Sequence, residues 1–373
     1  MKYTIAVIPG DGIGPEVTEQ AKKALDAVAE AYDHIFLYKE AKLGACAIEE
    51  TGSPLPKETI EICRNADAVL FGAIGDPKYD NDPTAEVRPE QGLLQLRREL
   101  GLHCNIRPIK AYDNLIFNSP LKREVIKGTD IVVYRELTGG IYSGEKQISE
   151  DEKSAFEISK YSVDEISKVT HLAFKAALSR KKKVTLIDKA NVLATSRLWR
   201  KTVSNIAKEY DNVELECLFI DNAIKQIILN PKQFDVILAP NLFGDIVSEG
   251  ASIIGGSIGL LASSSIGGKN ALFEPVHGSY HLAKGKNIAN PIASILSVAM
   301  LLEYLGLQEE SDAVERAVEK SLAIGITTKD IKRKTQKYTT TSKVGDFIAD
   351  YITNQDDSNM NFKNIHMGQS TII

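Results

Sequence analysis

The sequence has few cysteines and no excess of basic charge, and both absences exclude classes of protein. Its four cysteines, Cys46, Cys63, Cys104 and Cys217, are scattered and form no C-x-x-C pair. That spacing argues against a disulfide framework or a cysteine zinc site and favours free thiols in a reducing compartment. A formal net charge of −5 argues against nucleic acid or an anionic membrane as the main partner.

Long hydrophobic runs are also missing. The most apolar region, residues 292–305, is interrupted by Ser294, Ser297 and Glu303 and is too short to span a bilayer. The stretch from Met1 to Pro9 is too short in apolar residues to be a signal peptide. We therefore expect a cytoplasmic protein that binds neither a membrane nor nucleic acid.

What is present is an alternation of short β-branched runs with longer helical patterns, which indicates an α/β fold. A length of 373 residues exceeds one ordinary hydrophobic core, so two domains or one large unit are expected. The expected strands are Thr4–Ile8, Ile35–Lys39, Ala68–Phe71, Asn105–Pro108, Ile131–Arg135, Val184–Asp188, Glu214–Phe219 and Val236–Ala239. The expected helices include Pro15–Ala31, Gly92–Leu100, Val163–Leu178, Ser196–Glu209, Pro291–Leu305 and Asp312–Leu322.

Residues 138–161 are rich in glycine, serine and charge, and they interrupt this alternation. An excursion of about 20 residues inside a compact domain usually has its own role, often at an interface. The polar stretch that begins at Thr353 is expected to be a tail or an extension along the surface.

Two carboxylates four residues apart, Asp245 and Glu249, follow the apolar run 234–240. On a helix this spacing places both on one face, beyond the carboxyl end of a strand, where open α/β sheets bind ligands. Oxygen ligands on a rigid turn suit Mg²⁺ or Mn²⁺. Taken alone, the pair also fits a solvated acidic helix face.

Three other features suggest chemistry. The glycine turn 9–16 resembles a dinucleotide fingerprint, but its G-x-G-x-G spacing and the lack of an acidic partner make it a weak Rossmann match. Arg97, Arg107 and Arg135 belong to an arginine-rich set whose planar guanidinium groups suit a polycarboxylate, although each also fits a surface ion pair. Lys189 ends an apolar strand and is either a strand end or a general base.

Together these motifs resemble the β-decarboxylating dehydrogenases that act on isocitrate and isopropylmalate, from Ile8 to about Gly325. The matching stretches are Pro9–Val17, Arg88–Leu94, Arg135–Tyr142, Asp188–Val192, Phe243–Ile246, Phe273–Gly278 and Ile288–Pro291. The resemblance implies a non-Rossmann open αβα sandwich of two domains. Residues 1–102 and 256–373 would form the cofactor side, and 103–255 the metal and substrate side with the dimer interface. It also implies a homodimer with shared active sites, in which 138–161 is an arm between subunits.

The same resemblance implies a reaction and residue roles. A nicotinamide cofactor oxidises the hydroxyl of a malate derivative, and carbon dioxide then leaves the β-keto acid. Lys189 matches the base and Tyr142 the acid that protonates the enol. The metal positions for Mg²⁺ or Mn²⁺ are Asp221, Asp245 and Glu249, where the family usually has Asp in place of Glu249. The family's equivalents of Lys189 and Asp221 reach across the dimer.

Substrate binding would use the carboxylate-binding arginines Arg97, Arg107 and Arg135, with Asp221. Glu90 and Leu93 match the positions that face the substrate side chain. Because leucine cannot hydrogen-bond a third carboxylate, we expect isopropylmalate rather than isocitrate. D-malate or tartrate is the alternative substrate, and a non-catalytic regulatory subunit is the alternative function.

The positions matched to the cofactor are Ile13, Glu90, Glu274, His277, Gly278, Leu282 and Asn290. Leu282 stands where NAD-using relatives place an Asp that binds the adenosine ribose, and the Lys-Tyr pair of NADP-using relatives is absent as well. His281 and Lys284 lie nearby in sequence and fit either a phosphate contact or simple exposure to solvent. We expect NAD.

Overall fold

The computed structural model describes residues 1–82, 84–333 and 337–354. The chain divides into two compact units. The first unit contains residues 1–100, 257–264 and those from Asn270 onward, and the second contains 101–256 and 265–269. Residues 101–102, 256 and 265–269, which we expected in the first domain, fall in the second unit. Of the expected polar tail, Thr353 and Asn354 end a helix and the remainder lies outside the described residues.

The first unit combines parallel strands with helices. Its elements are β1 (Lys2–Gly10), α1 (Gly14–Tyr32), β2 (Ile35–Glu40), α2 (Ala45–Thr51), α3 (Lys57–Asn65), β3 (Ala68–Ala73), α4 (Pro77–Asp80), α5 (Pro89–Glu99), β12 (Ala271–Pro275), α11 (Ile292–Tyr304), α12 (Gln308–Ile324) and α13 (Thr341–Asn354). β11 (Ala262–Ile266) begins in this unit and ends in the second.

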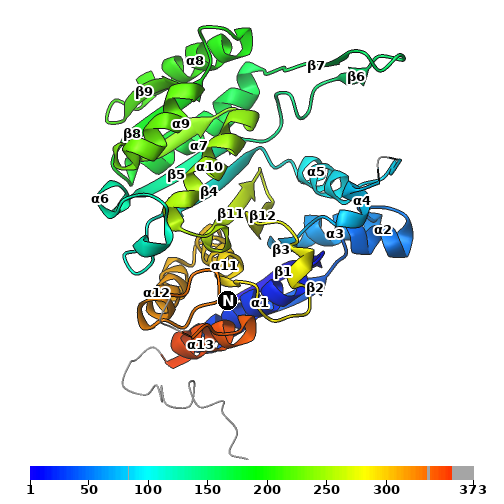
Figure 1. Cartoon of the computed structure of the whole chain (residues 1–373), viewed down its shortest axis with the longest axis vertical. Helices are drawn as coiled ribbons and strands as arrows, with labels where there is room; N and C mark the ends of the chain where they lie inside the picture. The colour runs from blue at the N-terminus through cyan, green and yellow to red at the C-terminus, as the bar shows by residue number, and fades with distance from the viewer. Residues whose placement is uncertain (83, 334–336, 355–373) are drawn as a thin grey trace, which may run out of the picture. The chain divides into compact units, whose positions relative to one another are not determined.

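Strands of the first unit run in the order β2-β1-β3-β12, and the pairs β1–β2, β1–β3 and β12–β3 are parallel. Helices α1 and α11 pack directly on these strands, and α13 packs along α1, as Figure 1 shows. The chain leaves β1 toward β2 on one side and returns to β3 on the other. Right-handed crossovers in opposite directions place their helices on opposite faces. The ends of β1 and β3 therefore meet where the strand order reverses, which is where such sheets bind ligands.

The second unit also combines mostly parallel strands with helices, but its strands are connected in a different order. Its elements are β4 (Cys104–Lys110), α6 (Arg123–Ile126), β5 (Asp130–Glu136), β6 (Lys146–Ile148), β7 (Ala155–Glu157), α7 (Val163–Leu178), β8 (Lys183–Asp188), α8 (Ala194–Ile206), β9 (Glu214–Phe219), α9 (Ile220–Leu229), β10 (Val236–Ala239) and α10 (Asn241–Gly255). The strand order is β4-β5-β10-β8-β9, with β4 antiparallel to β5 and the others parallel.

Strand direction in the second unit explains where its polar groups gather. The chain moves from β5 past β10 to β8 and β9, and then returns from β9 to β10. Helices α7 and α8 pack together, as do α9 and α10, so the two pairs cover opposite faces. β5 and β10 are neighbours whose following helices lie on different faces. Their carboxyl ends, at Arg135 and Ala239, form the reversal point of this unit.

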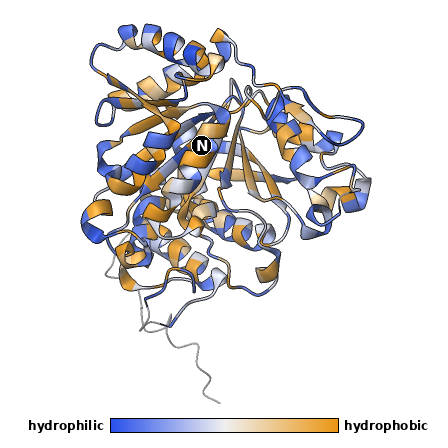
Figure 2. Cartoon of the chain, turned by 45° about the horizontal axis from the view of Figure 1, so that its top comes forward, coloured by the Kyte–Doolittle hydropathy of each residue, from blue (hydrophilic) through white to orange (hydrophobic). Residues whose placement is uncertain are grey.

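Apolar residues concentrate on the strands, as the colouring of Figure 2 shows. All six residues of β3 and all four of β10 are buried, as expected for parallel strands covered on both faces. In the second unit the core gathers around Trp199, Phe174 and Leu186. No helix in the described part of the chain is long and apolar enough to cross a membrane.

Each expected strand and helix is present, with ends that differ by a few residues. The expected elements did not include the helices α2, α3, α4, α6, α9 and α13 or the strands β6, β7, β11 and β12. Residues 138–161 contain a short antiparallel hairpin, β6–β7, whose residues are all exposed. We call residues 138–161 the arm.

Candidate active site

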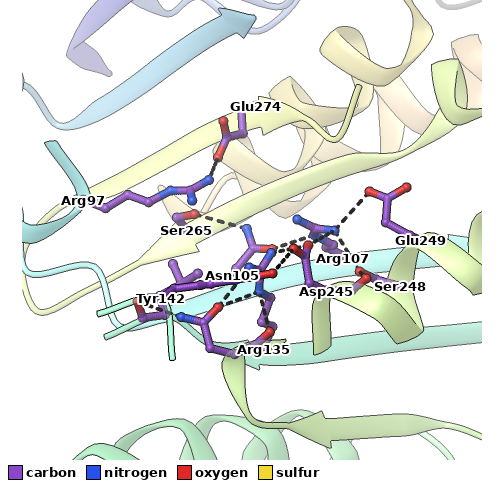
Figure 3. Close-up of polar contacts among 12 residues, drawn as sticks. Arg97, Asn105, Arg107, Arg135, Tyr142, Asp245, Ser248, Glu249, Ser265 and Glu274 are labelled. Atoms are coloured by element: carbon purple, nitrogen blue, oxygen red, sulfur yellow. Dashed lines mark hydrogen bonds and ion pairs between the residues drawn. The ribbon is translucent and has the colours of Figure 1, made fainter. Parts of the chain in front are cut away.

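Two buried arginines meet one carboxylate at the reversal point of the second unit (Figure 3). Arg135, near the end of β5, donates from Nη1 to Asp245 Oδ1 on α10 at 2.6 Å. Arg107, on the neighbouring strand β4, has its Nη1 3.4 Å from the same oxygen. Asp245 has 31% of its side chain exposed. Its carboxylate therefore contacts two buried guanidinium groups on one side and solvent on the other.

Arg107 also reaches the second acid of α10. Its Nη1 donates to Ser248 Oγ at 2.8 Å and lies 3.6 Å from Glu249 Oε1. Asn105 fixes the other end of the guanidinium, because Arg107 Nε donates to Asn105 Oδ1 at 2.7 Å. One positive group thus lies within ion-pair distance of both carboxylates, and the two acids converge on the same point.

Tyr142 completes this group from the arm. Its hydroxyl donates to Asp245 Oδ2 at 3.2 Å, and the Arg135 guanidinium carbon lies 5.8 Å from its ring centre. Burial, followed by the Asp245 charge, raises the pKa of Tyr142 above its usual value, against the opposing charge of Arg135. The hydroxyl therefore keeps its proton at neutral pH and can donate it. We call Arg107, Arg135, Tyr142, Asp245 and Glu249 the arginine cluster.

Lys189 and Asp221 form a separate pair in the same unit, which we call the lysine pair. Lys189 follows β8, and Asp221 lies in the first turn of α9. The Lys189 ammonium donates to the Asp221 carboxylate, and this hydrogen bond is the main cause of the lowered pKa of Asp221. Both side chains face solvent, with 28% and 65% of their areas exposed.

The residues around Lys189 hold it in place. Asp188, fully buried, accepts two hydrogen bonds from Arg200, at 2.7 and 2.8 Å. The Lys189 ammonium and the Arg200 guanidinium both lie over the ring of Phe219, 5.7 and 5.2 Å from its centre. An ion pair with a buried carboxylate and an aromatic face thus fix the strand end that carries Lys189.

The three expected metal ligands are not gathered in one chain. Asp245 and Glu249 lie together on α10, but no group of three or more His, Cys, Asp or Glu side chains among the described residues is arranged to hold a metal ion. Asp221 therefore does not complete a three-carboxylate site with Asp245 and Glu249 within a single chain.

In the first unit, Arg97 of α5 contacts Glu274 of β12 (Figure 3). Arg97 Nη2 donates to Glu274 Oε1 at 2.7 Å, and only 16% and 8% of the two side chains are exposed. The buried Arg97 Nε has no partner among the described residues. We expected Arg97 to bind substrate and Glu274 the cofactor, and the structure brings the two side chains together.

The loop that follows β12 carries most of the expected cofactor positions. Ile13 is buried against Val17, Ala283 and Ala289, and its N–H donates to Ser279 O at 2.8 Å. Leu282, in contrast, has 78% of its area exposed. Gly278 is exposed as well.

The other cofactor and side-chain positions differ in how they are held. His277 Nε2 is buried with no partner in the described chain, and burial lowers the pKa of this imidazole. Asn290 uses both ends of its amide, donating to Asp330 at 3.0 Å and accepting from Ile292 N at 3.1 Å. On α5, Glu90 is exposed and Leu93 is 9% exposed.

Sequence reasoning missed several polar residues that organise these groups. Asp11, 5% exposed, accepts hydrogen bonds from the N–H groups of Ala45, Cys46 and Gly75 at 2.9 to 3.0 Å. A Cβ on Gly44, whose φ is +92°, would lie 2.4 Å from Asp11 Oδ2, so glycine is required there. The signal was an acid inside a glycine turn. Asn105 and Asn241, which hold Arg107 and Arg135, had no comparable signal.

Comparison with known proteins identifies the family. Residues 4–348 match the family model described as isocitrate/isopropylmalate dehydrogenase. The chain is 54% identical over 352 residues to a protein of Wolinella succinogenes named 3-isopropylmalate dehydrogenase, covering 94% of this chain and 98% of that one. It is 52% identical over 351 residues to a protein of the same name from Sulfurimonas denitrificans, with coverage of 94% and 98%.

Among solved structures, isocitrate dehydrogenase from Methylococcus capsulatus is similar, with a TM-score of 0.83 at 31% identity, covering 94% of this chain and 99% of that one. The family match spans almost all of the described residues, and the motif stretches that carry the arginine cluster and the lysine pair fall inside it. The chain therefore belongs to the isocitrate/isopropylmalate dehydrogenase family.

Proposed function

We propose that this protein is an enzyme that oxidises and decarboxylates 3-isopropylmalate to 4-methyl-2-oxopentanoate, with NAD as oxidant, in leucine biosynthesis. The observation that carries the proposal is the arginine cluster, in which two buried guanidinium groups, a protonated tyrosine and two acids converge. Relatives at 54% and 52% identity that bear the name 3-isopropylmalate dehydrogenase support the choice of substrate.

The proposed reaction needs a base, an anion-binding group and an acid. Arg107 and Arg135 bind the carboxylates of the malate group, which matches the planar geometry of guanidinium. Lys189 Nζ, once its ammonium has lost a proton to solvent, would take the hydroxyl proton, and a bound nicotinamide would accept the hydride from the carbon that bears the hydroxyl. The bond to the β-carboxylate then breaks, carbon dioxide departs, and the electron pair forms an enolate. Tyr142 donates its proton to that carbon and yields the 2-oxo acid.

The residues of α10 fit a divalent cation. Asp245 and Glu249 both lie within ion-pair distance of Arg107 Nη1, so their carboxylates converge, and the exposed parts of both side chains leave oxygen atoms available to a cation from solvent. Carboxylate oxygens are suited to Mg²⁺ or Mn²⁺, which when bound would stabilise the negative charge of the enolate as a Lewis acid. Asp221 is our proposed third ligand, contributed by the partner subunit.

A shared site requires a dimer, and the second unit has the surface for one. Apolar side chains are exposed on α9, on α10 and in the loop after β8: Ile228, Leu229, Ile246, Val192 and Leu193. The hairpin of the arm adds Ile148, 67% exposed, and Phe156, 45% exposed. Exposed apolar residues gathered on neighbouring elements favour an interface between proteins. We assign this surface to a homodimer in which the lysine pair completes the partner's site.

The residues of the first unit fit a nicotinamide cofactor. His277 has a buried ring nitrogen without a partner in the described chain, which suits a hydrogen bond to a ligand base. Gly278 leaves open space above the loop backbone, since a Cβ there would meet nothing within 4 Å. Leu282 cannot accept a hydrogen bond from a ribose, so we rest NAD on the absence of the Lys-Tyr pair that NADP-using relatives have at this position. Arg97, Glu90 and Leu93 stay predictions for the substrate.

A single grid of assays tests the proposal. Isopropylmalate, D-malate and isocitrate are each combined with NAD or NADP, with and without Mn²⁺. We expect the highest kcat/KM with isopropylmalate, NAD and Mn²⁺. Absence of turnover in that one combination would refute the proposed function. Equal kcat/KM for D-malate and isopropylmalate would agree with the proposed reaction but would reject the proposed role of Leu93 in accepting the alkyl group.

A further inference from the structure

Asn241, the first residue of α10, uses every polar atom of its side chain. Its exposed fraction is only 3%. The amide oxygen accepts from Arg135 Nε at 3.1 Å and from Arg135 Nη2 at 2.9 Å. The amide nitrogen donates to Leu137 O at 3.3 Å and to Gly139 O at 3.2 Å. One carboxamide therefore joins an arginine of the cluster to the segment where the chain leaves β5 for the arm.

The backbone of Asn241 reaches the other end of the arm. Its N–H donates to the hydroxyl of Tyr161 at 3.0 Å, and its carbonyl accepts from Arg135 Nε at 3.0 Å. Tyr161 is itself fixed, since its ring packs edge-on against buried Trp199 with centres 5.4 Å apart. A Cβ on Gly140 would lie 2.3 Å from the Tyr161 hydroxyl, so the start and end of the arm are in close contact.

Glu136 accepts hydrogen bonds from the backbone N–H groups at the start of the arm, which Asn241 does not contact. Its buried carboxylate accepts from Thr138 N at 2.6 Å and from Gly139 N at 2.9 Å. The N–H groups of this turn thus bond to Glu136, while its carbonyls bond to Asn241. Because the same turn leads directly to Tyr142, its position determines where the tyrosine hydroxyl lies.

We propose that Asn241 is a positioning residue that keeps Tyr142 and Arg135 in a fixed relation on Asp245. Only a carboxamide can accept from a guanidinium and donate to two carbonyls at once. Aspartate would keep the acceptor and lose the donor, and it would place an oxygen against both carbonyls. The contribution to turnover rests on the proposed function, whereas the structural coupling does not.

The first test is hydrogen exchange in Asn241→Asp. Arg135 keeps its acceptor, but the turn loses its bonds to Leu137 O and Gly139 O. We expect the amides of Thr138, Gly139 and Gly140 to exchange about ten to a hundred times faster, the range that one or two lost hydrogen bonds produce. The matched control is Asn118→Asp, since Asn118 Nδ2 donates to Gly256 O at 2.7 Å, just beyond the last residue of α10. Equal exchange in both variants would overturn the proposal.

The second test is a double-mutant cycle on kcat with Tyr142→Phe. If Asn241 acts through Tyr142, Asn241→Asp lowers kcat about tenfold in the wild type and hardly at all in the Tyr142→Phe background. KM for the dicarboxylate stays within about twofold, because Arg135 remains held. If the double variant loses kcat by the product of the two single-variant factors, the two residues act independently and the proposal is rejected. A wild-type chain without turnover would refute the proposed function, and the exchange comparison would still decide the role of Asn241.

A second variant covers the case in which Asn241→Asp does not fold. Tyr161→Phe removes only the hydroxyl that accepts from Asn241 N. We expect faster exchange of the same three amides, by a smaller factor of about ten. Unchanged exchange at these amides in Tyr161→Phe would contradict the coupling between the two ends of the arm.

Discussion

The arginine cluster and the lysine pair hold charge in opposite ways, although both lie at strand ends of the second unit. Arg135 has 7% of its side chain exposed, and its three guanidinium nitrogens bond to Asp245 and Asn241. Lys189 and Asp221 are 28% and 65% exposed and share one hydrogen bond. The first arrangement is determined by packing within the chain, and the second is open to solvent.

The difference in burial between the arginine cluster and the lysine pair follows from the energy of an unpaired charge in each environment. A buried guanidinium that lost its partners would carry an uncompensated charge, so its site must be complete within the chain. An exposed ion pair contributes little to stability and remains free to meet another surface. The comparison fits the proposed dimer, in which the lysine pair works in the partner's site. It predicts that mutations in the pair affect activity alone, whereas mutations in the cluster affect stability as well.

The largest expected effect is that of Lys189→Met on turnover. Loss of a general base lowers kcat about 10²- to 10⁴-fold. The free energy of unfolding should hardly change, because the lost ion pair is exposed. Steady-state kinetics and urea unfolding measure the two quantities. Lys168→Met is the matched control, since Lys168 forms an exposed ion pair with Asp164 at 2.6 Å. Equal losses of kcat in both variants would remove Lys189 from the mechanism.

Arg135→Met should lower the free energy of unfolding by more than the loss of an exposed ion pair does. Breaking a fully buried pair costs about 3–5 kcal/mol, and because Asp245 is partly exposed we expect about 2–3 kcal/mol here. Arg64→Met, which breaks the exposed pair with Glu99 at 2.5 Å, should cost less than about 1 kcal/mol. Urea unfolding compares the variants. If both lose the same free energy of unfolding, burial does not distinguish the cluster from a surface pair.

Much of the fold could be predicted because its signals are local. The apolar runs that form β3 and β10 are buried on both faces, as is the centre of β1, and the family match confirms the fold class. β11 was missed because Ala262–Ile266 is mostly serine, which resembles a loop. Its hydroxyls are buried and hydrogen-bonded, with Ser263 donating to Glu274 O at 3.1 Å and Ser265 accepting from Asn105 at 3.1 Å. Those partners are distant in sequence, so no local pattern indicates them.

The residues of the candidate site could be recognised in the sequence by their type, whereas the residues that hold them in position could not. Arg107, Arg135, Tyr142 and Asp245 were predicted and meet in the structure. Their assigned roles stay predictions. Asn241 and Glu136 act through hydrogen bonds to backbone groups, which depend on how strands and turns meet in space. An asparagine before an apolar helix predicts a cap, and only the fold reveals that its partner is Arg135.

Glu136, which supports the turn that leads to Tyr142, and Asp221 of the lysine pair should respond to pH with opposite signs. Burial raises the pKa of Glu136, so its stabilising contribution is full below the unfolded value of about 4.3 and is lost as pH rises through the folded pKa. Asp221 has a lowered pKa because Lys189 donates to it, so its contribution is present above the unfolded value of about 3.9 and is lost as pH falls through the folded pKa.

Unfolding by urea at pH values from about 2 to 8 tests this contrast. Glu136→Gln should flatten the decline of stability with rising pH. Asp221→Asn should leave that decline unchanged and lower stability slightly at the upper end, because the lost pair is exposed. A Glu136→Gln profile parallel to that of the wild type would show that burial of Glu136 does not govern the pH dependence.

The smallest expected effect concerns Glu249, where the family usually has aspartate. Glu249 is 49% exposed and lies 3.6 Å from Arg107, whereas Asp245 is 31% exposed and directly bonded to Arg135. Its longer side chain suits contact with the cation through a water molecule, since Mg²⁺ tolerates little distortion of its octahedron. Glu249→Asp should therefore change the Kd for Mn²⁺ by about threefold or less, ~0.7 kcal/mol. Asp245→Asn should raise it more than about a hundredfold, as expected for loss of a direct ligand. Titration of Mn²⁺ followed by its electron spin resonance signal measures both values without turnover. A large loss of affinity in Glu249→Asp would make Glu249 a direct ligand and would place it with Asp245 among the residues that the chain must hold rigidly.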